Sequence, residues 1–172
     1  MSEPTGPGSR KRPTYLKGER ELLDGWLEFH RATLLAKCEG LNPEQLRAQP
    51  VTPSPLSLHG LIRHMAETER NWFGRILQGN LTLTRIWDST MEPSNGMVPP
   101  DAADWNQDLH AWLAECEASR QAAARHDLGD AGNWRDKDVT LRSIYQHMIQ
   151  EYARHNGHAD LIRESLDGST GL

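Results

Sequence analysis

The chain has 172 residues, of which 37% are hydrophobic and 25% are charged, as expected for one globular domain. Its 24 acidic and 19 basic residues leave a formal net charge of −5, which argues against general binding of nucleic acid or anionic membranes. No apolar run approaches the ~20 residues of a membrane-spanning helix, and residues 1–12 lack the apolar core of a secretory signal. Only two cysteines occur, far apart in sequence, which excludes a disulfide framework and a cysteine-based zinc site. We therefore expect a cytoplasmic protein.

The first half of the chain contains a tail, two long helices and one short helix. Residues 1–14 are rich in glycine, proline and charge, and we expect a flexible tail. Apolar residues at steps of three and four predict a helix over residues 19–39, and Asn42-Pro43 starts a short helix that ends before Pro50. Ser57 is the predicted cap of a second long helix that ends at Gly79. Prolines over residues 80–100 predict a long loop.

The second half continues the helical pattern. Asp101 or Asp104 caps a third long helix that frays near His126, and residues 129–138 are predicted to be a loop. Thr140 caps a fourth long helix that runs to about residue 166. No alternating strand pattern of useful length is present. The sequence thus predicts an all-α four-helix bundle over residues 15–168, with a short extra helix and a tail at residues 169–172.

Four polar residues of the fourth long helix fall in one narrow sector. At ~100° per residue, His147, Glu151, His155 and His158 lie within ~80° of one another and overlap the apolar stripe of the helix. A carboxylate buried there must be neutralised, paired or bound to a metal. Glu151 and His155 are one turn apart and can reach the same ion, and His64 lies at the edge of the apolar face of the second long helix. Three such ligands would leave a coordination position open, as in catalytic sites.

Spacing alone leaves another interpretation open. Glu151 can instead pair with an arginine, Arg63 or Arg70, and an i, i+4 pair of this kind is common on helices. Four further histidines are interpreted as ordinary hydrogen-bonded residues at the boundary of the core: His30, His59, His110 and His126.

Two segments of the chain resemble a known family. Residues 64–73, HMAETERNWF, and 151–164, EYARHNGHADLIRE, are similar to the two signatures of the DinB-like superfamily, in particular of an actinobacterial branch. The resemblance extends from about residue 15 to residue 168. It implies a four-helix bundle around a divalent metal held by His64, Glu151 and His155. The Glu-x-x-x-His pair matches the variant found in mycothiol-dependent maleylpyruvate isomerases.

The resemblance also implies roles for neighbouring residues. His158 stands where relatives often have glutamine, and we expect it to support a ligand or to face the substrate. His147 is expected to line the mouth of the pocket, and Glu67 to support the ligands. No acid–base residue is assigned. The further C-terminal domain of the isomerases has no counterpart here, so their isomerisation is not expected.

Family members with assigned activity transfer low-molecular-weight thiols such as mycothiol. The resemblance therefore implies a thiol cosubstrate and an electrophilic substrate. Zinc is the expected ion, although nickel, iron and manganese also accept two imidazoles and a carboxylate. A homodimer is a further expectation. Two other functions stay open at this point: a metal-dependent hydrolase, and a non-enzymatic bundle that binds metal or small ligands.

Overall fold

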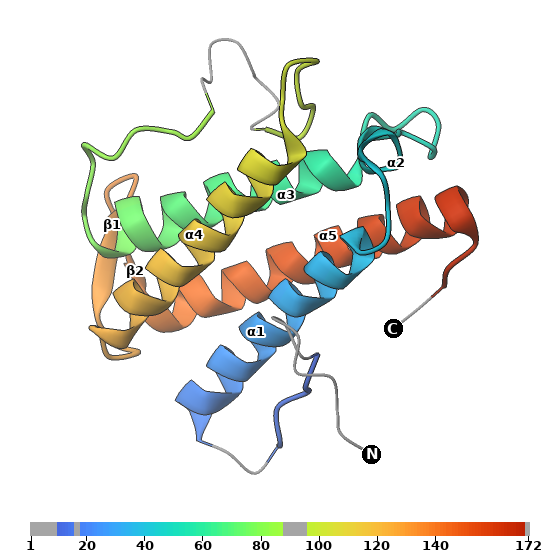
Figure 1. The fold of residues 1–172 in the computed structure, drawn as a ribbon. Helices are drawn as coiled ribbons and strands as arrows, with labels where there is room; N and C mark the ends of the chain where they lie inside the picture. Colours follow the sequence, from blue (N-terminus) through green and yellow to red (C-terminus); the bar gives the residue numbers. More distant parts are fainter. Residues whose placement is uncertain (1–9, 16–17, 88–95, 171–172) are drawn as a thin grey trace.

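The structure, a computed structural model, describes residues 10–15, 18–87 and 96–170 (Figure 1). Within these residues the protein is mostly helical and has one two-stranded antiparallel sheet. In chain order the elements are α1 (Glu19–Cys38), α2 (Pro43–Arg47), α3 (Leu58–Glu69), η1 (Arg70–Leu77), α4 (Trp105–Ala124), β1 (Ala131–Trp134), β2 (Lys137–Thr140) and α5 (Leu141–Asp167).

The helices begin at the residues that the capping pattern predicts. Asn42 forms a capping box with Gln45 at the start of α2. The side chains of Ser57 and Thr140 accept hydrogen bonds from backbone N–H groups in the first turns of α3 and α5. Of the two predicted caps of α4, Asp104 is the one that caps the helix. These local interactions satisfy backbone donors that a helix leaves free at its N-terminus.

The second long helix has the predicted extent but changes its winding. From Arg70 to Leu77 it is a π-helix, η1, in which backbone N–H groups bond one residue further back than in an α-helix. The N–H of Gln78, for example, donates to the carbonyl of Phe73 over 3.3 Å. Such windings occur frequently at functional sites.

The prediction of a loop over residues 129–138 is wrong. β1 and β2 form a hairpin in which Ala131 pairs with Thr140 and Trp134 with Lys137. Arg135 and Asp136 make the turn, with φ angles of 53° and 61°. The strands have four residues each and are largely exposed, so they carry no alternating apolar pattern that sequence reading can detect. Contacts with η1 support the hairpin instead.

The long helices pack in neighbouring pairs around one core. α1 packs mainly against α5, α3 packs mainly against α4, and α3 also contacts α5 (Figure 1). The core contains the apolar residues that the helical periodicity predicts, including the fully buried Leu34, Leu61, Met65, Ile144 and Met148. Because α3 and α5 are neighbours, polar residues at the edges of their apolar faces meet between them.

A buried hydrogen-bond network connects all four long helices. The guanidinium of Arg31 on α1 donates to both oxygens of Glu69 on α3, over 2.8 and 2.6 Å. The hydroxyl of Tyr152 on α5 donates to the same carboxylate over 2.7 Å, and the indole of Trp112 on α4 donates to that hydroxyl over 3.0 Å. These groups are mutually satisfied, as buried polar groups must be.

Parts of the predicted organisation lie outside the described residues. These are residues 1–9 of the N-terminal tail, residues 171–172 and residues 88–95 of the long loop. Residues 10–15 form neither helix nor strand. In the described part of the chain, the helices are too short or too polar to span a lipid bilayer.

A candidate metal centre and the pocket beside it

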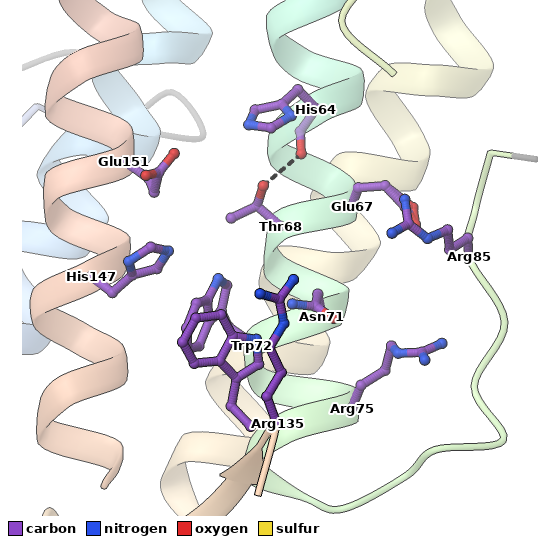
Figure 2. A pocket seen from close by; sticks show the side chains of 11 residues that line it. His64, Glu67, Thr68, Asn71, Trp72, Arg75, Arg85, Arg135, His147 and Glu151 are labelled. Carbon is purple, nitrogen blue, oxygen red and sulfur yellow. Dashed lines mark hydrogen bonds between the residues drawn. The ribbon is translucent and has the colours of Figure 1, made fainter. Parts of the chain in front are cut away.

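Two helices bring three potential metal ligands together. His64 comes from α3, and Glu151 and His155 come from α5. One ligand atom from each lies within 4.8 Å of the others. His155 is buried, and the other two are half-buried. Figure 2 shows His64 and Glu151 extending from facing helices toward the space between them.

A neighbouring histidine orients His155. The Nε2 atom of His155 lies 3.5 Å from a carboxylate oxygen of Glu151, and its ring centroid lies 4.8 Å from that of His64. Its other ring nitrogen, Nδ1, is 3.3 Å from Nδ1 of His158, so one of the two atoms donates a hydrogen bond. If Nδ1 of His155 carries the proton, its Nε2 lone pair points toward Glu151 and His64. This is how ligating histidines are usually held.

Burial keeps the imidazole of His155 neutral. Loss of solvation, with the nearby His64, lowers the pKa of His155 from 6.5 to about 4, and the Glu151 carboxylate opposes this only in part. The ring is therefore uncharged at neutral pH. Neutral imidazole is the form that binds a metal ion.

The arginines considered as alternative partners of Glu151 pair elsewhere. Arg63 donates to Asp108 over 2.7 Å, and Arg70 donates to Glu115 over 2.6 Å. Glu151 forms an ion pair with Arg154, at 3.6 Å on the same helix, but 65% of the Arg154 side chain is exposed. Exposed pairs of this kind contribute little.

The four histidines predicted to be ordinary boundary residues are hydrogen-bonded. Asn156 donates toward His30 over 3.3 Å, and the rings of His110 and His126 bond to carbonyl oxygens one turn earlier in α4. His59 differs from the expectation because it is fully buried. Its Nε2 lies 2.7 Å from a carboxylate oxygen of Asp108, which explains how the core accommodates it.

A pocket of about 420 Å³ adjoins the three candidate ligands (Figure 2). His64 and Glu151 form one end of it. Other elements that line the pocket are the second half of α3, η1, the segment after η1, the hairpin and the start of α5. They contribute Glu67, Thr68, Asn71, Trp72, Arg75, Arg85, Trp134, Arg135 and His147.

Aromatic rings form one wall of this pocket. The ring centroid of Trp72 lies 4.1 Å from that of His147 and 5.6 Å from that of Trp134. Burial lowers the pKa of His147, so its ring is neutral at pH 7. Trp72 thus contacts two other flat side chains in the pocket that the candidate ligands adjoin.

Glu67 lines the pocket and stabilises the segment that follows η1. Its two carboxylate oxygens accept the backbone N–H of Ile86, at 3.0 and 3.1 Å. Burial raises the pKa of Glu67, although these hydrogen bonds oppose the effect. Arg85 is carried to the pocket on the same segment.

Sequence reasoning missed the basic residues of the pocket. Arg75 and Arg85 are 10 residues apart, but Arg135 follows 50 residues after Arg85, and its position depends on a hairpin that has no sequence signal. The turn residues Arg135 and Asp136 lack the Asn-Gly or Asp-Gly sequence that usually marks such turns.

The two cysteines cannot supply a reactive thiolate. Both are buried, and burial raises the pKa of the Cys38 thiol to about 12. Burial raises the pKa of Cys116 as well, and the neighbouring Glu69 carboxylate adds to the shift. A thiol that reacts in the pocket must therefore come from another molecule.

The helical fold, together with two histidines and a glutamate that converge from α3 and α5, defines a protein of the DinB-like type. The comparison with protein families is more specific. Residues 22–168 match the Mycothiol-S-transferase family, and the chain belongs to this family. Neither the curated proteins nor the solved structures gave a match.

Proposed function

We propose that this protein binds a divalent metal ion through His64, Glu151 and His155 and transfers a mycothiol-like thiol to an electrophilic substrate. The observation that carries the proposal is the convergence of the three ligand atoms within 4.8 Å, in a chain of the Mycothiol-S-transferase family. The sequence-based expectations of a four-helix bundle, a homodimer and a cytoplasmic location accompany this proposal.

The donor set fits such an ion. It combines two imidazoles and one carboxylate, which suits zinc and also nickel, iron or manganese. Glu151 has only an exposed arginine and His155 as ion-pair partners in the described chain, so its carboxylate can serve as a ligand. We propose zinc. A bound ion would lower the pKa of a coordinating thiol and hold it as a thiolate at neutral pH.

The other residues of the site position the reactants. His158 orients the ring of His155 through their shared hydrogen bond. The aromatic wall at Trp72 offers a flat surface for the electrophile next to the ligand cluster. In the transfer, the thiolate sulfur forms a bond to the electrophilic carbon, and the leaving group departs with the electrons of its bond.

The first test measures metal. Elemental analysis of protein purified without added metal should find about one ion per chain in the wild type and none in His155→Ala. Saturating metal at about 100 times its Kd stabilises a protein by about 2.7 kcal/mol, or about 5 to 11 °C in Tm for a chain of this size. We expect this increase in Tm in the wild type and not in His155→Ala.

His110→Ala is the matched control. His110 is exposed and bonds to the carbonyl of Asn106 in its own helix. This variant should keep its metal content and its stabilisation. Full metal content in His155→Ala, or loss of metal in His110→Ala, would show that the ligands are assigned wrongly.

The second test separates the candidate activities. Conjugation of an electrophile by mycothiol, dependent on metal and on His155, supports the transferase. Turnover of esters or amides in the absence of thiol would support a metal-dependent hydrolase instead. Metal binding without either activity would leave a non-enzymatic binding protein.

A further inference from the structure

Arginines line the pocket on the side of the hairpin and η1. In Figure 2, His64 and Glu151 lie at one end, Arg75 extends from the opposite end, and the side chain of Arg135 rises from the hairpin beside Trp72. We propose that this arginine-lined side binds the anionic group of an aromatic electrophile, so that the second substrate is a planar aryl carboxylate or a similar anion. This inference rests on the proposed thiol transfer and names its substrate class.

The charges of the pocket favour an anion. Three arginines and two glutamates line it, in a protein whose net charge is −5. One of the glutamates, Glu151, belongs to the proposed metal cluster. Within the described residues, Arg75 and Arg135 form no salt bridge: Arg75 donates to the carbonyl of Leu83, and Arg135 lies 5.0 Å from the ring of Trp134. Their positive charge is therefore available to a ligand.

The hairpin holds Arg135 in place at a conformational cost. Arg135 and Asp136 both adopt positive φ angles, which glycine and asparagine tolerate far better. A two-residue hairpin loop favours positive φ at both of its central residues, so the turn fixes where the Arg135 side chain starts. A glycine brings the hairpin close to η1: a Cβ atom on Gly132 would lie 2.1 Å from the carbonyl oxygen of Ile76. The close approach carries Trp134 and Arg135 to the pocket.

The aromatic wall connects the arginine-lined side to the candidate ligands. The ring centroid of Trp72 lies 4.1 Å from that of His147 and 5.6 Å from that of Trp134, so the three rings form one continuous wall. A flat ring can stack on this wall with its anionic group toward the arginines. Its electrophilic carbon then faces the end of the pocket where the thiol is proposed to bind. A thiolate needs no arginine there, because the metal would compensate its charge.

A matched pair of probes tests the substrate class. In 4-chloro-3,5-dinitrobenzoate, the thiolate sulfur bonds to the ring carbon that carries chlorine, and chloride leaves with the bonding electrons. The thiol proton passes to solvent. The methyl ester of this compound has the same ring and leaving group without the charge. With mycothiol and the metal-loaded wild-type protein, kcat/KM for the acid should exceed that for the ester at least tenfold.

Two variants localise the preference. Arg135→Gln and Arg75→Gln should each lower kcat/KM for the acid about tenfold and change the value for the ester less than twofold. Arg135→Lys keeps the charge and should retain most of the preference. Arg125→Gln is the matched control, because Arg125 is exposed and does not line this pocket. Equal turnover of acid and ester by the wild type would overturn the inference. This comparison needs no variant, so it holds even if a variant fails to fold.

A binding measurement separates this inference from the proposed function. 3,5-Dinitrobenzoate lacks the leaving group, and its binding can be followed without thiol through quenching of tryptophan fluorescence. We expect it to bind the wild type at least tenfold more tightly than its methyl ester does, and Arg135→Gln to remove this difference. Selective binding with no conjugation of either chlorinated probe would refute thiol transfer but retain the anion site. Conjugation with no preference for the carboxylate would support thiol transfer and refute the anion site.

Discussion

At the scale of single residues, two buried histidines differ through the carboxylates beside them. His59 faces Asp108, which also accepts a hydrogen bond from the buried Arg63, so this carboxylate is fully engaged within the core. His155 faces Glu151, whose arginine partner is exposed. A carboxylate without a buried cation can still bind one. This difference separates a structural histidine from a candidate ligand.

The two buried cysteines should be unreactive in the folded protein. At pH 8 and a pKa of about 12, about one Cys38 thiol in 10⁴ is ionised, and the pKa of Cys116 is raised too. Iodoacetamide should therefore leave the native protein unmodified for hours, as measured by intact mass. In guanidinium chloride, two adducts per chain should form within minutes. Modification of the native protein at the rate of a free thiol would contradict the burial of these residues.

At the scale of elements, the hairpin depends on its contact with η1. Its strands are short and exposed, and a two-stranded hairpin of this size is not stable alone in water. The backbone of Gly132 lies against the carbonyl of Ile76, where no side chain fits. The position of the hairpin is thus determined by one close backbone contact.

Replacing this glycine should displace the hairpin. Gly132→Ala should destabilise the protein by about 1 to 3 kcal/mol, the usual cost of overpacking, and weaken binding of 3,5-dinitrobenzoate. Thermal unfolding and fluorescence quenching measure the two effects. Gly157→Ala is the control. Gly157 lies within α5, and a Cβ atom there would have no neighbour within 4 Å. This substitution should stabilise the helix by about 0.5 to 1 kcal/mol. If Gly132→Ala leaves both stability and binding unchanged, the contact between Gly132 and the carbonyl of Ile76 is not tight.

The elements also show what the sequence could and could not predict. The starts of α2, α3 and α5 follow from the side chains of Asn42, Ser57 and Thr140, which cap their own helices, and this chemistry is local. The convergence of His64 with Glu151 and His155 followed from helix periodicity together with the family resemblance. The hairpin, the π-helix and the meeting of the three arginines depend on contacts between distant segments. No local pattern encodes those contacts.

At the scale of the whole molecule, the network around Glu69 joins α1, α3, α4 and α5 in one buried set of hydrogen bonds. Its centre is the ion pair of Arg31 with Glu69: the side chain of Glu69 has no exposed surface and that of Arg31 is 5% exposed. Arg31 also pairs with Glu28, whose side chain is 44% exposed and which pairs with Arg120 as well. A buried pair such as that of Arg31 with Glu69 costs much when it is broken and little when both charges are removed together.

Arg31→Met should therefore destabilise the protein strongly. Loss of one partner of a buried ion pair costs about 3 to 5 kcal/mol, which lowers Tm by about 6 to 20 °C for a chain of this length. The double variant Arg31→Met/Glu69→Gln removes both charges and keeps an oxygen that accepts the hydrogen bond from Tyr152. It should recover at least half of the loss. A double variant no more stable than Arg31→Met would show that charge imbalance is not the cause.

Trp134 and Arg135, at the tip of the hairpin, can be replaced independently of the helical core. Trp134 and Arg135 reach the pocket from a protrusion that meets the helical core through a glycine backbone, whereas His64, Glu151 and His155 project from core helices. Replacement of the two tip residues leaves the interior packing of the helices intact. Libraries randomised at these two positions alone would thus change the lining of the pocket and leave the three candidate ligands unchanged.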